Sequence, residues 1–214
     1  MHVPDGFLPL PVIVGGYATT GALTWLSLRQ IDRLPNPQAA IPRASLLTAA
    51  FFVASWIHIP VPPASVHLVL NGLLGTILGY FAMPAILIGL FFQAIMFNHG
   101  GLSTLGVNAA MMGIPALLAY RIFQLRRLFP KAYERVGLGV AAFASGAFGL
   151  GLSAAIFVGL LVTTIPTSLD ASTERAAILT LTIAHVPVMA IEGAFTAALV
   201  LFLQRVRPQL LEQS

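Results

Sequence analysis

The residues of this sequence with the clearest potential for chemistry are its histidines. Imidazole is the commonest protein ligand for divalent transition metals. The chain contains no cysteine, so thiolate metal sites, disulfides and cysteine nucleophiles are excluded. Any metal site must therefore use nitrogen and oxygen donors. The five histidines are His2, His58, His67, His99 and His185.

The first two residues, Met1 and His2, can chelate a metal ion together. The free α-amine, the backbone nitrogen of residue 2 and Nδ1 of His2 fill three corners of a plane, and a donor from elsewhere must fill the fourth. His67, at the outer end of a predicted rigid helix, is the best candidate. Tetragonal nitrogen ligation suits Ni(II) and Cu(II) and is possible for Co(II). Because these ligands must lose protons, binding should weaken as the pH falls.

This chelate requires an unprocessed N-terminus. A cleavable signal peptide begins with a basic region, but the first basic residue here is Arg29. We therefore expect the N-terminus to be retained, and the bulky His2 to protect Met1 from removal.

The composition indicates that lipid surrounds most of the chain. Hydrophobic residues make up 57% of the sequence and charged residues only 8%, against about 25% charged in soluble domains. Backbone groups in hydrocarbon must be satisfied within their own segment. The sequence therefore predicts an all-α, polytopic membrane helix bundle forming one domain over residues 1–214, with residues 1–7 as a metal-binding N-terminal segment outside the membrane.

Seven apolar stretches predict the membrane spans, and Met83 and Pro84 predict a tight turn between the third and the fourth. The stretches lie near residues 8–28, 44–59, 66–82, 84–98, 106–124, 136–165 and 176–204.

The distribution of basic residues predicts the orientation. With the N-terminus outside and the C-terminus inside, only Arg175 among the 11 lysines and arginines lies outside, as the positive-inside rule requires. The basic residues are thus topology signals, and we expect no nucleic-acid partner. In this orientation His2, His58, His67 and His99 lie on the outer side. His185 lies nearly ten residues into the seventh stretch, roughly 15 Å deep.

Two motifs resemble a known family. They are the opening MHVPDGFL of residues 1–8 and the segment FQAIMFNHGGLSTLGVN of residues 92–108, continued by MGI at 112–114. Both are similar to motifs of the CbiM/NikM family, the substrate-binding (S component) membrane subunits of energy-coupling-factor cobalt and nickel transporters. The likeness covers residues 1–120 closely and the remainder by hydropathy.

The resemblance implies a ligand set. In the family the metal is held by the terminal amine of the first residue, the backbone and side-chain nitrogens of the second, and a later histidine; these roles fall on Met1, His2 and His67. Cobalt-type members often have Ser-His-Pro-Thr-Gly around the third ligand, whereas residues 65–72 are SVHLVLNG. The choice between cobalt and nickel stays open. The ion is a transported substrate, and no resident cofactor is expected.

The energy for transport must come from partners, because the sequence has no P-loop motif. The resemblance implies a transmembrane scaffold subunit, two ABC-type ATPase subunits and a small auxiliary membrane subunit in the bacterial cell membrane. One alternative is a stand-alone secondary transporter or channel for divalent metal. Another is a zinc hydrolase, disfavoured because the sequence has no H-E-x-x-H pattern and no carboxylate near His58, His67 or His99.

Several polar residues outside this ligand set could support the site. Asp5 and Gly6 are expected to shape the loop that folds the N-terminus into the bundle, with the carboxylate capping backbone amides. Other polar residues could form a second shell around the metal or bridge neighbouring helices. These residues are Gln93, Asn98, His99 and Asn108.

Glu192 is the one acidic residue well inside a predicted span. An intramembrane carboxylate is a functional candidate, and we expect a structural or coupling role for it. The small-residue spacings Ala18/Ala22 and Ala50/Ala54 could allow close packing against a scaffold subunit.

Overall fold

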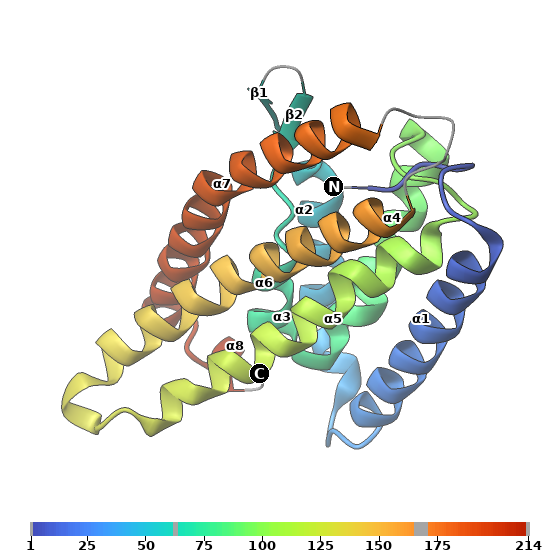
Figure 1. The fold of residues 1–214 in the computed structure, drawn as a ribbon. Coiled ribbons are helices and arrows are strands. Elements are labelled where there is room, and N and C mark those ends of the chain that lie inside the picture. Colours follow the sequence, from blue (N-terminus) through green and yellow to red (C-terminus); the bar gives the residue numbers. More distant parts are fainter. Residues whose placement is uncertain (1, 62–63, 165–170, 213–214) are drawn as a thin grey trace.

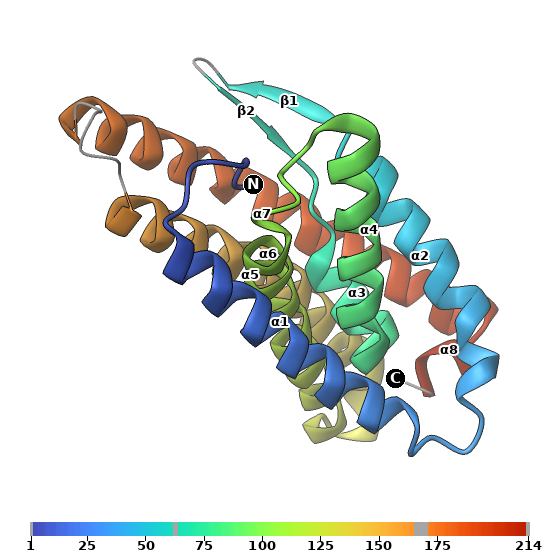
Figure 2. The same ribbon diagram turned by 90° about the vertical axis from the view of Figure 1, so that its right-hand side faces the viewer.

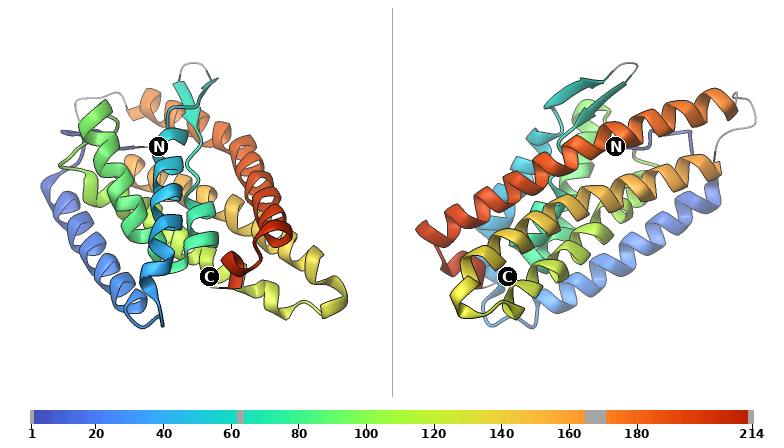
Figure 3. Two further views of the ribbon diagram at one scale, coloured as in Figure 1. Left: turned by 180° about the vertical axis from the view of Figure 1, so that it is seen from behind. Right: turned by 60° about the vertical axis from the view of Figure 1, so that its left-hand side comes forward.

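The computed structural model describes residues 2–61, 64–164 and 171–212, which form a bundle of helices with one short β-hairpin (Figure 1). Helices α6 and α7 are the longest and run side by side (Figures 1 and 3). The hairpin projects from the same end as the N-terminus (Figure 2). The elements are α1 (Leu10–Ile31), α2 (Ile41–Ala54), β1 (His58–Val61), β2 (Ala64–His67), α3 (Asn71–Leu78), α4 (Ala82–Phe97), α5 (Leu105–Gln124), α6 (Glu134–Thr164), α7 (Ala171–Val206) and α8 (Gln209–Glu212).

The all-α bundle predicted from the composition is confirmed, since each of the seven apolar stretches contains an α-helix. Among the described residues, four helical stretches are long and apolar enough to cross a membrane, namely Asn71–Phe97, Leu105–Leu128, Lys131–Thr164 and Thr182–Val206. Helices α1 and α2 do not belong to this set. The number of spans and their orientation therefore stay predictions.

The prediction of one helix over residues 66–82 is wrong at its N-terminal end. Residues 64–67 form strand β2, and the helix begins only at Asn71. His67 is therefore the last residue of a strand, paired in register with His58 of β1, and does not lie on a rigid helix. Three prolines between residues 60 and 63 disfavour helix here, because proline has no N–H and restricts the residue before it. Helix α2 likewise ends at Ala54, before the predicted residue 59.

The chain reverses direction between α3 and α4. Nε2 of His67 and Nε2 of His99 are 3.4 Å apart, whereas a straight helix over Asn71–Phe97 would separate its ends by about 40 Å. The reversal occurs at Gly79, with φ +57°, four residues before the predicted turn at Met83. The extended segment after His67 and the short α3 together cover about 25 Å, which matches the roughly 24 Å of α4 (Figure 2).

Helix α3 is enclosed by protein on all sides, because all of its residues are buried. A Cβ atom on Gly75 would collide with the backbone of Ala116 in α5, and one on Gly72 would lie 2.7 Å from the carbonyl oxygen of Gly146 in α6. Backbones can approach this closely only at glycine. The space directly beneath His67 is therefore tightly packed protein.

A buried carboxylate stabilises the irregular segment that precedes α3. Both oxygens of Glu192, on α7, accept hydrogen bonds from the backbone amide of Leu70, at 3.1 and 3.0 Å, and one of them also accepts the amide of Val69. Leu70 has φ +58°, a left-handed conformation that costs a non-glycine residue roughly 1–2 kcal/mol. Glu192 thus has the structural role expected for it, and it offsets this strain.

Replacement of Glu192 should destabilise the protein. Glu192→Ala leaves two buried amides without acceptors, at about 1–3 kcal/mol each, and we expect a clearly lower melting temperature in detergent. Glu192→Gln keeps one acceptor oxygen and should fall between Glu192→Ala and the wild type. Glu134→Ala, at the exposed start of α6, is the control and should change little. A Glu192→Ala protein as stable as the wild type would contradict this role.

Candidate metal centre

Three imidazoles from distant parts of the chain meet at one end of the bundle. His2, His67 and His99 each offer one ring nitrogen, and these three atoms lie within 4.8 Å of one another. The ring of His2 stacks on that of His67, with centroids 5.2 Å apart, and meets His99 edge-on at 4.1 Å. Three nitrogen donors at this separation can bind a single divalent ion.

The backbone that follows the hairpin orients His67. Its Nδ1–H donates to the carbonyl oxygen of Leu68 at 2.9 Å, which leaves Nε2 to face the cluster. Nε2 of His67 is 3.4 Å from Nε2 of His99. At this separation the two nitrogens can share a hydrogen bond or bind one metal ion. A hydrogen bond on the far ring nitrogen of this kind is typical of metal-binding histidines.

The end of helix α4 positions His99. Asn98 adopts the left-handed conformation, with φ +52°, and the backbone N–H of His99 donates to the carbonyl oxygen of Gln93 at 3.1 Å. The amide of Asn98 donates to the same carbonyl oxygen, and asparagine tolerates the left-handed conformation at which the helix ends. Asn98 therefore terminates the helix, and its conformation turns His99 back towards His2 and His67.

The side chain of Asn108, on α5, binds the N-terminal segment as a neighbouring strand would. Its Oδ1 accepts the amide of Val3 at 2.9 Å, and its Nδ2 donates to the carbonyl oxygen of Val3 at 3.0 Å. The Thr104 hydroxyl donates to the same carbonyl oxygen at 2.6 Å. Asn108 was expected only as a general polar neighbour of the site, and Thr104 was not expected at all. Together they fix the backbone of Val3, next to His2.

Asp5 binds the loop after α4, as expected. Its carboxylate accepts the amides of Leu102 at 3.2 Å and Ser103 at 2.8 Å, as well as the Ser103 hydroxyl. The hydrogen bonds from Ser103 lower the pKa of Asp5 below its ordinary 3.8. Their contribution is therefore complete at neutral pH and is lost only as the pH falls through the lowered pKa. Gly101 allows this contact, because a Cβ atom there would collide with Asp5. Gly6, the residue after Asp5, has φ +79°, a left-handed conformation that favours glycine.

The His2 side chain is only half-buried as a whole, but both of its ring nitrogens are buried, and neither has a hydrogen-bond partner among the described residues. Burial lowers the pKa of His2 well below its ordinary 6.5, and the rings of His99 and His67 lower it further. Gln93 opposes part of this shift but does not reach hydrogen-bond geometry with His2. The imidazole is therefore neutral at neutral pH, with a lone pair available for a metal.

Of the predicted ligands, the structure places His2 and His67 together and adds His99. Met1 and the His58 side chain lie outside the described residues, so their predicted roles stay untested. His185 is buried on α7 and does not belong to the three-histidine group. It lies 14 residues after Ala171, where α7 begins, and its depth in the membrane stays a prediction.

The fold and the site define a helical membrane protein that gathers imidazole donors beside its N-terminal segment. Residues 2–210 match the family model described as "CbiM: Cobalt uptake substrate-specific transmembrane region". The chain therefore belongs to the CbiM family.

Known proteins similar to this chain support the same assignment. It is 32% identical to the "Putative metal transport protein" of Haemophilus influenzae, over 100% of this chain and 98% of that protein. It is 30% identical to the "Fused nickel transport protein NikMN" of Rhodobacter capsulatus, over 99% of this chain but only 64% of that longer protein. A crystal structure of a truncated transition metal transporter has the same fold, with a TM-score of 0.77 at 21% identity, covering 96% of this chain and 99% of that one.

Removal of the Asn108 amide should weaken metal binding. Asn108→Ala loses both hydrogen bonds to Val3, so the N-terminal segment is no longer held against α5. Changes to such supporting groups typically weaken metal affinity by about 10–100-fold, and we expect a loss in this range for Ni(II) and Co(II), measured by calorimetry. Asn36→Ala removes a cap in an exposed loop at the other end and serves as the control. Unchanged affinity in Asn108→Ala would show that the pairing does not position the ligands.

Proposed function

We propose that this chain is the substrate-binding subunit of an ATP-driven, energy-coupling-factor importer of divalent cobalt or nickel. The observation that carries the proposal is the convergence of His2, His67 and His99, whose ligand nitrogens lie within 4.8 Å of one another. Hydrogen bonds from α5 and from the loop after α4 hold the N-terminal segment at this point. Its family membership supports a role in metal uptake.

The proposed ligands are the α-amine of Met1, the backbone nitrogen and Nδ1 of His2, and Nε2 of His67. These four nitrogens fill the corners of a plane, an arrangement that suits Ni(II) and is possible for Co(II). His99 contacts both other rings. We assign it the role of donating Nε2–H to Nε2 of His67 in the metal-free protein, until the ion takes its place.

The structure disfavours a channel through the chain itself. The segment beneath His67 is the fully buried α3, which packs backbone to backbone against α5 and α6. Glu192, the acidic group expected inside the bundle, is already bound to two backbone amides, so it is poorly suited to carry protons. These observations favour a binding subunit over a stand-alone secondary transporter or channel. They also disfavour a zinc hydrolase, because the described donor cluster contains histidines and no carboxylate.

The proposed partners are a transmembrane scaffold subunit, two ABC-type ATPase subunits and a small auxiliary membrane subunit. The fused nickel transport relative from Rhodobacter capsulatus extends well beyond the length of this chain, which is consistent with further components in the working transporter. We place the chain as a multi-pass protein in the bacterial cell membrane, with seven spans, the N-terminus outside and the C-terminus inside. Metal uptake by vesicles that contain this chain alone would instead favour a secondary transporter.

The chelate can be tested by lengthening the N-terminus. Insertion of one alanine between Met1 and His2 moves the amine out of chelating position, and acetylation of the terminus blocks it. Either change should weaken Ni(II) or Co(II) binding by more than the 10–100-fold typical of supporting residues, with an unchanged melting temperature in detergent. Calorimetry on the protein with the inserted alanine tests this directly, because tight metal binding by that variant would refute the amine chelate.

The fourth donor can be identified by comparing two single substitutions. His67→Ala removes a proposed ligand and should lose most of the metal affinity. His99→Ala removes only a contact to the ligands, so the loss of metal affinity should be smaller, within about 10–100-fold. The metal affinities of both variants are measured by calorimetry on protein without the inserted alanine. If His67→Ala bound metal normally and His99→Ala did not, the fourth donor would be His99; if both bound normally, it would be His58.

A further inference from the structure

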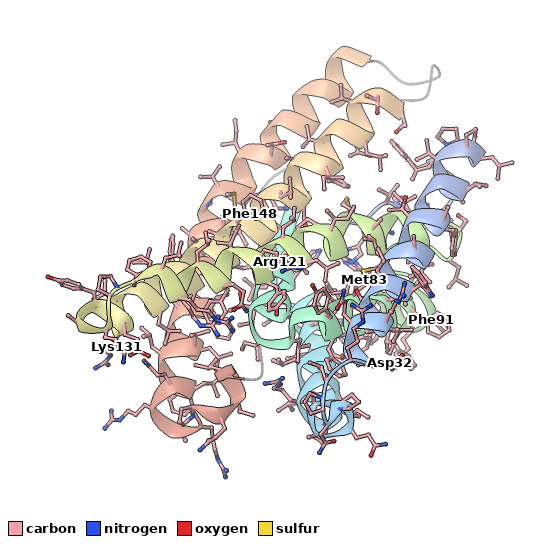
Figure 4. All side chains as sticks on the ribbon, turned by 90° about the horizontal axis from the view of Figure 1, so that it is seen from below. Asp32, Met83, Phe91, Arg121, Lys131 and Phe148 are labelled. Carbon is pink, nitrogen blue, oxygen red and sulfur yellow. The ribbon has the colours of Figure 1, made fainter. Side chains whose placement is uncertain are left out.

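A second candidate site lies at the end of the molecule away from the histidines. It is a cavity of about 590 Å³ bounded by the end of α1, the loop before α2, the α3–α4 turn and α5. Figure 4 looks onto this end and labels Asp32, which directly follows α1, and Arg121, on α5. The polar side chains lining the cavity are Gln30, Arg33, Asn36, Arg43, Tyr80 and Tyr120.

The charge of the cavity is suited to an anion. Arg33 and Arg43 line it, and no aspartate or glutamate is among its described lining residues. Arg43 donates from Nη1 to the carbonyl oxygen of Leu210, but its Nε is buried and has no hydrogen-bond partner among the described residues. A buried guanidinium N–H without an acceptor is costly. Phosphate and carboxylate oxygens are the acceptors that best match the geometry of a guanidinium group.

An apolar groove adjoins the basic cavity. It has a volume of about 480 Å³ and lies between α2 and α4, from Ile41 and Phe81 to Met96. Phe81 lines both the groove and the cavity. The exposed fractions of Ile88 and Met96 along it are 50% and 59%. At 1.5 Å per helical residue the groove runs about 22 Å along α4, more than the roughly 15 Å thickness of one hydrocarbon leaflet.

The chemistry of the groove and its position indicate what it can hold. Its lining side chains from α2 and α4 are almost all apolar, and through Phe81 it continues into the arginine-lined cavity. A molecule that fills both must therefore carry an anionic group at one end and a hydrocarbon chain at the other.

We propose that the basic cavity and the groove form one binding site for an anionic glycerophospholipid. The phosphate lies against Arg33 and Arg43, and one acyl chain lies between α2 and α4. Basic pockets between membrane helices bind anionic headgroups in this way. The proposal requires that the helices lie in the membrane and does not depend on the metal site. The proposed orientation, with the N-terminus outside, places the lipid in the cytoplasmic leaflet.

The headgroup contact is tested by native mass spectrometry of the purified full chain. The protein is titrated with phosphatidylglycerol or phosphatidylcholine carrying the same acyl chains, and we expect clear preference for phosphatidylglycerol. A basic residue near a membrane surface contributes about fivefold to the affinity for anionic lipid, so Arg33→Gln and Arg43→Gln should each reduce binding about fivefold. Arg127→Gln, an exposed arginine outside the cavity, should leave it unchanged. Equal binding of the two lipids, or unchanged binding in both cavity variants, would overturn the proposal.

The acyl contact is tested by a matched pair of substitutions on α2. Ala49 lines the groove and its neighbour Ala50 does not, so Ala49→Phe should weaken phosphatidylglycerol binding several-fold and Ala50→Phe should not. Millimolar inorganic phosphate should not displace the lipid. Displacement by phosphate together with normal lipid binding by Ala49→Phe would identify a free-phosphate site. If Ala49→Phe bound the lipid normally and phosphate did not displace it, the acyl chain would not lie in the groove. Either result would refute the proposal. Melting temperature and nickel affinity monitor the fold and the metal site separately in every variant.

Discussion

The hydrogen bonds from Val69 and Leu70 to Glu192 are the contacts on which the rest of the site depends. They allow the chain to remain extended inside the bundle, where an unpaired backbone amide would be costly. This extended segment and the short α3 together match the length of α4. As a result the chain returns from the turn at Gly79 to the level of His67, and His99 lies next to it. A regular helix over the same residues could not bring the two imidazoles together.

Polar contacts with the segment between α4 and α5 hold the N-terminal segment at the site. Among the described residues, the loop after α4 donates to Asp5, and Thr104 and the start of α5 bind the backbone of Val3. His99 belongs to the same segment of sequence. The motif at residues 92–108 therefore both supplies an imidazole and holds the residue that follows His2. The two sequence motifs of this chain are therefore in direct contact in the folded protein.

The two ends of the bundle differ in chemistry. One end gathers imidazoles whose nitrogens face one another, and the other carries arginines around a cavity with an adjoining apolar groove. Between them lies α3, packed through glycine against α5 and α6. In the part of the chain that the structure describes, tightly packed protein therefore separates the histidines from the arginine-lined cavity.

The sequence by itself determined the helical membrane bundle, the nitrogen character of the donors and the capping role of Asp5, because these follow from composition, residue type and local backbone chemistry. It also carried the motifs of the family. Only the tertiary structure decided that His67 lies on a strand, that α3 has half the expected length and that His99 joins His2 and His67. It alone revealed the pairing of Asn108 with Val3. These features depend on contacts between residues from about 30 to more than 120 positions apart. The hydropathy of residues 66–82 is the same whether they form a full helix or a strand and a half-helix. The second arrangement is stabilised by distant residues, among them the carboxylate of Glu192 on α7 and the backbones of α5 and α6 that pack against the glycines of α3.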